Sequence, residues 1–316
     1  MSEHAGPETV ALTGMGSIGV AFAVVFARAG FTVQATDPDA GRLGLVRDEV
    51  SVRLEQLARH GLLAEEPAEI LARVRPVGSL ADAVAGAALV QECAPERVDL
   101  KRGIFSQLDE LAAPGTVLAS SSSALTASAF AAQLPGRARV LVAHPGNPPY
   151  LLPVIELVPA PFTDPAAVDA AERLYTSAGL SPVRLNQEIE GFLFNRLQGA
   201  VLREAYCLVR DGIASAADVD KVVSQGLGLR WSFMGPFETV DLNTRGGIES
   251  HAAKMGPAYA LMGAQRGQHD PWTEDLVRAV AAERRTQLPL AGWESRVAWR
   301  DEQLMKLIHF KEETTP

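Results

Sequence analysis

The sequence feature that most limits the possible folds of this chain is VALTGMGSIGVAFAVVFARAGFTVQATD, residues 10–37. A short apolar run leads into Gly14-x-Gly16-x-x-Gly19, a helical pattern follows, and a second β-branched run ends in Asp37. Glycines at these positions permit a tight turn, close approach of the backbone to a pyrophosphate, and close packing of the helix. Because the strand, the helix and the acid occur in register, the pattern predicts a dinucleotide-binding βαβ unit.

The residues around Asp37 indicate which dinucleotide binds. At the end of a second strand, this carboxylate accepts hydrogen bonds from the adenosine ribose hydroxyls and repels a 2′-phosphate. The first arginine after it is Arg42, so we expect NAD rather than NADP. Ser17 and Ile18, which lie between the second and third glycines, are expected to line the same site. The alternative is that Asp37 only caps the following helix.

Short apolar runs alternate with longer helical patterns over the first part of the chain. This alternation is typical of βαβ units on a parallel sheet. With 316 residues, 47% of them apolar and 21% charged, the chain has the length and composition of two globular domains. We predict that residues 1–189 form a Rossmann-type α/β domain with a mostly parallel sheet. Its expected strands are 10–13, 32–36, 88–92, 117–120, 140–143, 155–158 and 183–186.

The second and third expected strands are separated by a long segment, residues 39–73. It reads as two helices joined near His60-Gly61, and it is too long for a simple crossover, so we expect a helical hairpin that projects from the sheet. After Glu190 the strand signals stop, and residues 190–316 are expected to form an all-helical domain. Its expected helices are 191–211, 216–226, 238–243, 248–255, 272–285 and 292–306.

Charge and composition exclude several classes of protein. A formal net charge of -9 argues against a nucleic-acid binder and against a polybasic membrane partner. The two cysteines, Cys93 and Cys207, are far apart and have neither a CxxC nor a metal-ligand spacing, so we expect no disulfide framework and no metal site. The polar N-terminus does not read as a secretory signal, and no apolar run is long enough to span a membrane. We therefore expect a cytoplasmic protein with a small-molecule substrate.

A bound nicotinamide implies hydride transfer, which requires a base to accept the hydroxyl proton of the substrate. His144 ends an apolar run and is expected at the carboxyl edge of the sheet, where an imidazole can exchange protons near neutral pH. Glu156 lies in the apolar run VIELV, where a carboxylate needs a partner. Pairing the two would orient the imidazole, and four prolines between residues 145 and 153 restrict the connecting segment. The alternatives are a solvent-facing His and an edge-strand Glu.

Longer motifs extend over nearly the whole chain, to about residue 257, and on these motifs the sequence resembles the 3-hydroxyacyl-CoA dehydrogenases. Within that family it is similar to the branch of lambda-crystallin and L-gulonate 3-dehydrogenase. The motifs are QECAPERVDLKR at 91–102, ASSSSAL at 119–125, AHPGNPPYLLPVIELVP at 143–159, GFLFNRLQ at 191–198 and GLGLRWSFMGPFETVDLN at 226–243.

The resemblance implies a catalytic His–Glu dyad, here His144 and Glu156, completed by Ser123 and Asn195. Ser123 follows an expected strand, and Asn195 begins the long helix after the domain boundary, so that Asn195 would reach the site from the second domain and make it depend on domain closure. The alternatives are a turn or cap serine and a helix asparagine bonded to backbone.

The same resemblance implies that Glu96 and Lys101 contact the cofactor. The alternative for both is a solvated helix start, where the helix dipole favours Glu96.

Two departures from the acyl-CoA members point to the lambda-crystallin side. This chain has Pro-Gly-Asn-Pro-Pro-Tyr at 145–150 after the expected base, and Ser-Ser-Ser-Ser-Ala at 120–124. It also has Arg230-Trp231, and a guanidinium suits a carboxylate, so Arg230 is the candidate that binds the acid end of the substrate, from its own or a partner subunit. The alternative is a structural salt bridge to an acid such as Glu238.

We therefore expect NAD-dependent oxidation of a short 3-hydroxy acid, such as L-gulonate, to the 3-keto acid. A 3-hydroxyacyl-CoA, another 3-hydroxyacyl thioester or a diketo ester is the alternative substrate. A structural protein or an NAD-binding sensor without activity is a further alternative. The apolar patterns of the second domain, above all over residues 192–208, predict a homodimer.

Overall fold

The computed structural model of the chain describes residues 8–232, 234–243, 247–266, 275, 278–279, 282, 286 and 289–314. It divides into two compact units, and the first contains Met1–Arg196 together with Trp299–Pro316. The second unit is Leu197–Ala298. The division differs from the expected boundary after residue 189, because the start of the long helix and the end of the chain both belong to the first unit.

The first unit is built on an eight-stranded sheet in the order β3-β2-β1-β4-β5-β6-β7-β8. The strands from β3 to β6 in this order are parallel, β7 is antiparallel to β6, and β8 is parallel to β7. The predicted Rossmann-type, mostly parallel sheet is therefore confirmed. The strands are β1 Thr9–Thr13, β2 Thr32–Thr36, β3 Val74–Pro76, β4 Ala87–Glu92, β5 Val117–Ser120, β6 Val140–Pro145, β7 Val154–Pro159 and β8 Ser181–Arg184.

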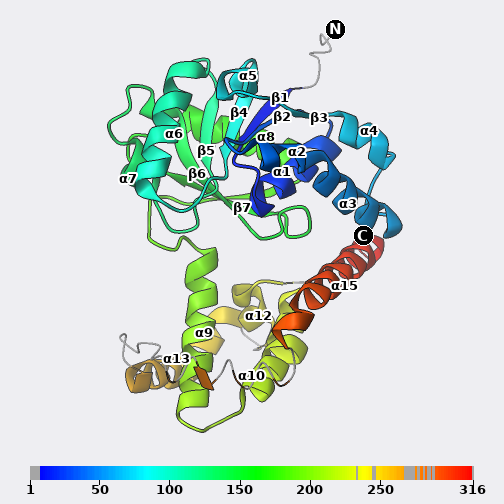
Figure 1. Cartoon of the computed structure of the whole chain (residues 1–316). Helices are drawn as coiled ribbons and strands as arrows, with labels where there is room; N and C mark the ends of the chain where they lie inside the picture. The colour runs from blue at the N-terminus through cyan, green and yellow to red at the C-terminus, as the bar shows by residue number, and fades with distance from the viewer. Residues whose placement is uncertain are drawn as a thin grey trace. The chain divides into compact units, whose positions relative to one another are not determined.

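Helices cover both faces of this sheet (Figure 1). Apolar side chains alternate along each strand, so Val10 and Leu12 of β1 pack with α1, α3, α4 and α8, while Ala11 packs on the other face with α5, α6 and α7. Met305 of the last helix joins the core on the α1 face. The helices are α1 Ser17–Arg28, α2 Ala40–Gly44, α3 Val46–Arg59, α4 Pro67–Ala72, α5 Leu80–Val84, α6 Val98–Leu111, α7 Ala127–Ala131, the 3-10 turn η1 Arg137–Arg139 and α8 Pro165–Ser177.

The segment between β2 and β3 differs in part from the expected helical hairpin. Its break lies at the predicted place, since α3 ends at Arg59 and Gly61 has a left-handed φ of 69°. However, the segment contains three helices, α2, α3 and α4, rather than two, and it ends in the short strand β3, which pairs with β2. Three residues are too few to produce a recognisable alternation, so the sequence pattern gave no signal for β3.

The β6–β7 pair is the part of the sheet that positions the candidate catalytic residues. These strands are antiparallel neighbours in which His144 is directly opposite Glu156. Side chains of directly opposed residues lie on the same face of a sheet. The amide of Gly146 donates to the carbonyl oxygen of Val154 at 2.8 Å and extends the same pairing by one position.

The second unit is helical in the part that the structure describes. The predicted break at Gly226 is instead a π-helical turn that continues from α10 into α11. The expected helix 272–285 lies largely outside the described residues. No helix in the described ranges is both long and apolar enough to cross a lipid bilayer. The elements are α9 Phe194–Arg210, which begins in the first unit, α10 Ala216–Val222, η2 Val223–Leu227, α11 Gly228–Trp231, α12 Pro236–Asn243, α13 Gly247–Arg266, η3 Leu290–Gly292 and α15 Trp293–Thr314, which ends in the first unit.

Candidate active site and cofactor cleft

A cleft of about 810 Å³ opens at the carboxyl ends of β1, β2 and β4. Ligands bind at this position in doubly wound α/β folds, where the strand order reverses. Most residues predicted to hold the cofactor line this cleft, namely Gly14, Gly16, Ser17, Ile18 and Asp37.

The three glycines of the loop have different surroundings. Gly14 has a φ of +87°, and a side chain there would meet the backbone of Cys93 and Ala94 at 2.8 Å. A side chain at Gly19 would collide with the carbonyl oxygen of Gly14. At Gly16, by contrast, no atom of the described chain beyond its two neighbouring residues lies within 4 Å of the position that a Cβ would occupy. Because Gly16 directly precedes α1, this open space at the helix N-terminus fits the pyrophosphate of NAD.

Asp37 and Arg42 both bind the backbone of Met15 in the glycine loop. The Oδ2 atom of Asp37 accepts from the amide of Met15 at 2.7 Å, and its Oδ1 atom accepts from the amide of Asp39 at 2.9 Å. Each oxygen keeps a lone pair for a ribose hydroxyl. Arg42 also lines the cleft, and its Nε atom donates to the carbonyl oxygen of Met15. The sequence spacing did not reveal this, because α2 turns Arg42 back towards the loop.

His144 and Glu156 form a short hydrogen bond on the face of the sheet that carries α6 and α7. The Nδ1 atom of His144 lies 2.6 Å from Oε2 of Glu156, and the two residues are 7% and 2% exposed. Burial alone would raise the pKa of Glu156, but hydrogen bonds from His144 and from two backbone amides hold this pKa below its ordinary value. The carboxylate therefore stays charged, and the Nε2 atom is the ring nitrogen left to exchange a proton.

The two amides belong to the turn that starts α9. Leu193 and Phe194 donate their N–H groups to Oε1 of Glu156 at 2.6 and 2.9 Å. The preceding residue, Phe192, is fully buried and has a left-handed φ of 50°, which is rare for a bulky side chain. The centroids of the Phe192 and His144 rings are 5.5 Å apart, and Phe194 meets the same imidazole edge-on at 6.3 Å. The turn thus supports both members of the His–Glu pair.

Asn195 connects this turn to the loop after β5, residues 121–125, which we call the serine loop. Its Nδ2 atom donates to the backbone oxygen of Ser123 at 2.9 Å, and Ser123 itself is exposed. Both residues belong to the first unit. The first turn of α9, which carries Asn195, is attached to the sheet through Glu156, and the dependence of the site on domain closure stays a prediction.

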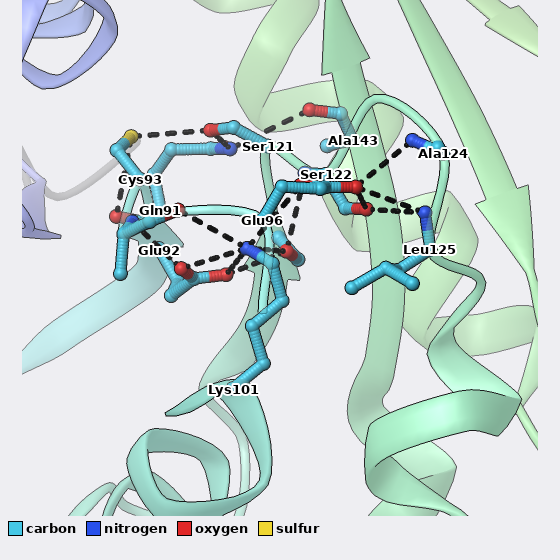
Figure 2. Close-up of polar contacts among 12 residues, drawn as sticks. Gln91, Glu92, Cys93, Glu96, Lys101, Ser121, Ser122, Ala124, Leu125 and Ala143 are labelled. Carbon is cyan, nitrogen blue, oxygen red and sulfur yellow. Dashed lines mark hydrogen bonds and ion pairs between the residues drawn. The ribbon is translucent and has the colours of Figure 1, made fainter. Parts of the chain in front are cut away.

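Glu96 holds the serine loop rather than lining the cleft. Figure 2 shows its carboxylate facing the loop, where Oε1 accepts from the hydroxyl of Ser122 and from the amides of Ala124 and Leu125 at 3.0 and 2.9 Å. Burial would raise the pKa of Glu96, but these hydrogen bonds lower it overall. These hydrogen bonds hold the residues directly before and after Ser123 in the chain.

Lys101 is fully buried beneath the same loop. Its ammonium group binds other side chains there, and these bonds compete with its predicted contact with the cofactor. Its Nζ atom lies 3.0 and 2.9 Å from the two carboxylate oxygens of Glu92, which is also fully buried, and 3.3 Å from the hydroxyl of Ser120 (Figure 2). Neither Lys101 nor Glu96 lines the cleft. Sequence reasoning missed Glu92, although a carboxylate at the end of an apolar run signals that a buried partner is needed.

A second buried polar chain extends from Gln91 on the opposite face of β4. Its Nε2 atom donates to the hydroxyl of Ser121 at 2.7 Å and lies 3.5 Å from the carbonyl oxygen of Ala143, while the hydroxyl of Tyr175 donates to its Oε1 atom. The thiol of Cys93 lies 3.1 Å from the Ser121 hydroxyl, and burial raises the pKa of Cys93 to about 12. The raised pKa keeps this thiol protonated near neutral pH.

The predicted carboxylate ligand Arg230 lies on α11 and is exposed. It belongs to the second unit. The side chain of Glu238, its alternative partner, lies outside the described part of the structure. In the described ranges, no group of three His, Cys, Asp or Glu side chains has an arrangement that suits a metal ion.

Comparisons with known proteins identify the family to which the chain belongs. The family description "3-hydroxyacyl-CoA dehydrogenase, NAD binding domain" matches residues 9–189, and its "C-terminal domain" counterpart matches residues 191–291. A lambda-crystallin homolog of Bos taurus is 40% identical over 309 residues, which cover 96% of each chain.

Two further relatives are enzymes by name. An L-carnitine dehydrogenase of Streptomyces griseus is 38% identical over 265 residues, which cover 84% of this chain and 76% of the relative. The solved structure of an NAD-dependent 5-formyl-3-hydroxy-2-methylpyridine 4-carboxylic acid 5-dehydrogenase is 27% identical, with a TM-score of 0.80 over 96% of this chain and 97% of the other. The chain belongs to the 3-hydroxyacyl-CoA dehydrogenase family and is an NAD-binding dehydrogenase of that family.

Proposed function

We propose that this protein oxidises a short, free 3-hydroxy carboxylic acid of the L-gulonate type to the 3-keto acid, with His144 as the base and Glu156 as its orienting partner. The observation that carries the proposal is the 2.6 Å contact between Nδ1 of His144 and Oε2 of Glu156. A carboxylate bonded to Nδ1 fixes the proton there, so Nε2 presents its lone pair to the substrate.

Each atom that leaves the substrate in the proposed reaction has an acceptor. The substrate loses a hydride from C3 and a proton from its 3-hydroxyl group, and His144 accepts that proton at Nε2. Glu156 stabilises the imidazolium that forms. Ser123 and Asn195 are the proposed hydrogen-bond partners of the reacting oxygen, where they stabilise the charge that develops as the C–O bond shortens.

Residues of the glycine loop would hold the cofactor. Gly14 and Gly16 let the backbone approach the pyrophosphate, and Ser17 and Ile18 start the helix whose N-terminus faces it. Asp37 would bind the adenosine ribose. When bound, NAD supplies the acceptor for the substrate hydride.

The choice of a free acid over a thioester rests on two supports. The residues 145–150 and the pair Arg230-Trp231 follow the lambda-crystallin branch, and Arg230 is the proposed ligand of the substrate carboxylate. In addition, two relatives are named for carboxylic acids, L-carnitine and a pyridine carboxylic acid. A 3-hydroxyacyl thioester or a diketo ester is the second candidate, because the family description itself names an acyl-CoA.

A substrate panel tests the proposal. The purified enzyme is assayed for NADH formation with L-gulonate, L-carnitine, 3-hydroxybutyrate and 3-hydroxybutyryl-CoA, and the His144→Ala variant is the control for each. Turnover of a free acid that is lost in the variant supports the proposal. Turnover of the thioester alone favours the second candidate, whereas NADH binding without turnover of any compound indicates a non-catalytic protein.

We also propose a homodimer formed through the second unit. Several large apolar side chains on α9 and α13 are more than half exposed in the single chain: Leu197, Tyr259, Leu261 and Met262. Such surfaces mark protein–protein interfaces. Size-exclusion chromatography with light scattering would give twice the chain mass of 33.6 kDa.

A further inference from the structure

The presence of Arg42 in the cofactor cleft raises a question about cofactor choice. An arginine beside the ribose-binding acid is the residue that accommodates the 2′-phosphate of NADP in Rossmann folds. Arg42 lines the same cleft as Asp37, and both contact the backbone of Met15. A chain that binds NAD should therefore contain something that prevents this arginine from recruiting NADP.

Glu49 is the group that engages Arg42. On α3, its Oε1 atom accepts from a terminal nitrogen of the Arg42 guanidinium, whose Nε atom is already bonded to Met15. Glu49 also lies 3.5 Å from Arg53, one turn further along the helix. The hydrogen bond from Arg42 is the largest influence on the pKa of Glu49 and lowers it, so the pair stays charged.

The charges around Arg42 are predominantly negative. The Glu49 bond and the nearby carboxylates of Asp37 and Asp39 all raise the pKa of Arg42. Arg53 offsets part of this charge through Glu49. A 2′-phosphate that entered here would meet Asp37 directly and would find the guanidinium already bonded to another anion, so its binding would require that bond to break.

We propose that Glu49 is a second determinant of the preference for NAD over NADP, acting by holding Arg42 in an ion pair. Asp37 repels the 2′-phosphate, and Glu49 withholds the one cleft-lining arginine of the described chain that would compensate. The discrimination is therefore shared between two carboxylates on different elements, the end of β2 and the middle of α3. This inference depends on NAD binding and not on the identity of the substrate.

Substitutions that keep the shape of each acid, remove its charge and turn one of its oxygens into an NH₂ group test this inference. Asp37→Asn, Glu49→Gln and the double variant are titrated with NADH and NADPH by the fluorescence of the reduced nicotinamide. Asp37→Asn is expected to weaken NADH about tenfold, since it alters a charge-assisted contact with the ribose. Adding Glu49→Gln to Asp37→Asn is expected to lower the Kd for NADPH by a further factor of about ten, because Arg42 is then free to pair with the phosphate.

Two controls make the result decisive. Glu55→Gln removes the same charge from the same helix α3, where Glu55 accepts a 3.2 Å hydrogen bond from Ser51 and, among the described residues, forms no ion pair. Adding Arg42→Ala to the double variant should reverse the gain in NADPH binding. The proposal is overturned if Glu49→Gln brings no gain in the Asp37→Asn background, if Glu55→Gln brings an equal gain, or if Arg42→Ala leaves the gain in place. Both substituted acids are partly exposed, and thermal unfolding verifies that each variant is folded.

Discussion

Replacing Glu156 with glutamine isolates the orienting role of its carboxylate. The amide has the shape of the acid, but one of its two ends becomes a donor. Oε1 faces the N–H groups of Leu193 and Phe194 at 2.6 and 2.9 Å, and both need an acceptor. The amide oxygen will therefore take that position, which turns the NH₂ group towards Nδ1 of His144. A donor at Nδ1 selects the tautomer with its proton on Nε2, and that nitrogen can no longer accept the substrate proton.

The expected fall in kcat follows from the free energy that the opposite orientation of the amide group would cost. Turning the amide round would restore the active tautomer but would leave two part-buried N–H donors facing an NH₂ group. Each unsatisfied donor costs about 1–3 kcal/mol, so the productive arrangement lies about 2–6 kcal/mol higher. At about 1.4 kcal/mol for each factor of ten, kcat should fall by roughly 30-fold to 10⁴-fold, with a central value near 10³-fold.

The assay is steady-state NADH formation with the best substrate of the panel, together with an NADH titration to verify that the cofactor cleft of the Glu156→Gln variant is intact. Glu188→Gln is the matched control, because Glu188 also accepts a backbone N–H, from Ser128 at 2.9 Å, but lies outside the pair. A loss of less than about tenfold in Glu156→Gln, or an equal loss in Glu188→Gln, would refute the tautomer argument.

Three further predictions concern the cofactor loop, the serine loop and acid stability. Gly19→Ala should lower the melting temperature, because its side chain would cause a steric collision that costs about 1–3 kcal/mol. Gly16→Ala should unfold near the wild-type temperature but raise the Kd for NADH. Thermal unfolding and NADH titration distinguish the two variants. Glu96→Ala should lower kcat about 10-fold to 100-fold, because it releases the loop that contains Ser123. Glu96→Gln keeps an acceptor and should recover most of the lost kcat. A raised Kd for NADH with a normal kcat would instead indicate that Glu96 contacts the cofactor. Because the folded-state pKa of Glu156 is depressed, its contribution to stability is present above the unfolded pKa of about 4.3 and is lost as the pH falls through the folded pKa. The gap in melting temperature between wild type and Glu156→Gln should therefore shrink in acid, and a gap that does not depend on pH would contradict this reasoning.

The sequence predicted those parts of the site that depend on local chemistry. The roles of Gly14, Gly16 and Gly19 follow from steric requirements of a single turn, and the structure has crowded positions at Gly14 and Gly19 and open space at Gly16. A carboxylate in the apolar run of β7 needed a partner, and the structure places Glu156 against His144.

The sequence could not predict features that depend on strand direction or on backbone groups. An apolar run has the same pattern in parallel and antiparallel strands, so the reversal at β7 left no signal. The amides of Leu193 and Phe194 carry no side-chain signature, although they bind Glu156. Arg42 and Glu49 lie on separate helices, and only the fold brings them together beside the cleft.

Because β6 and β7 are antiparallel neighbours, the position of the His144–Glu156 pair depends on the pairing of the strands and not on the loop between them. Register alone sets His144 opposite Glu156, from the pair Leu141 and Pro159 to the pair Pro145 and Ile155. Residues 146–153 can therefore change in length or composition without moving the pair, provided that the register is kept, whereas a slip by one residue would send the two side chains to opposite faces. The loop that joins β6 and β7 can therefore vary between related chains while the register keeps His144 and Glu156 side by side.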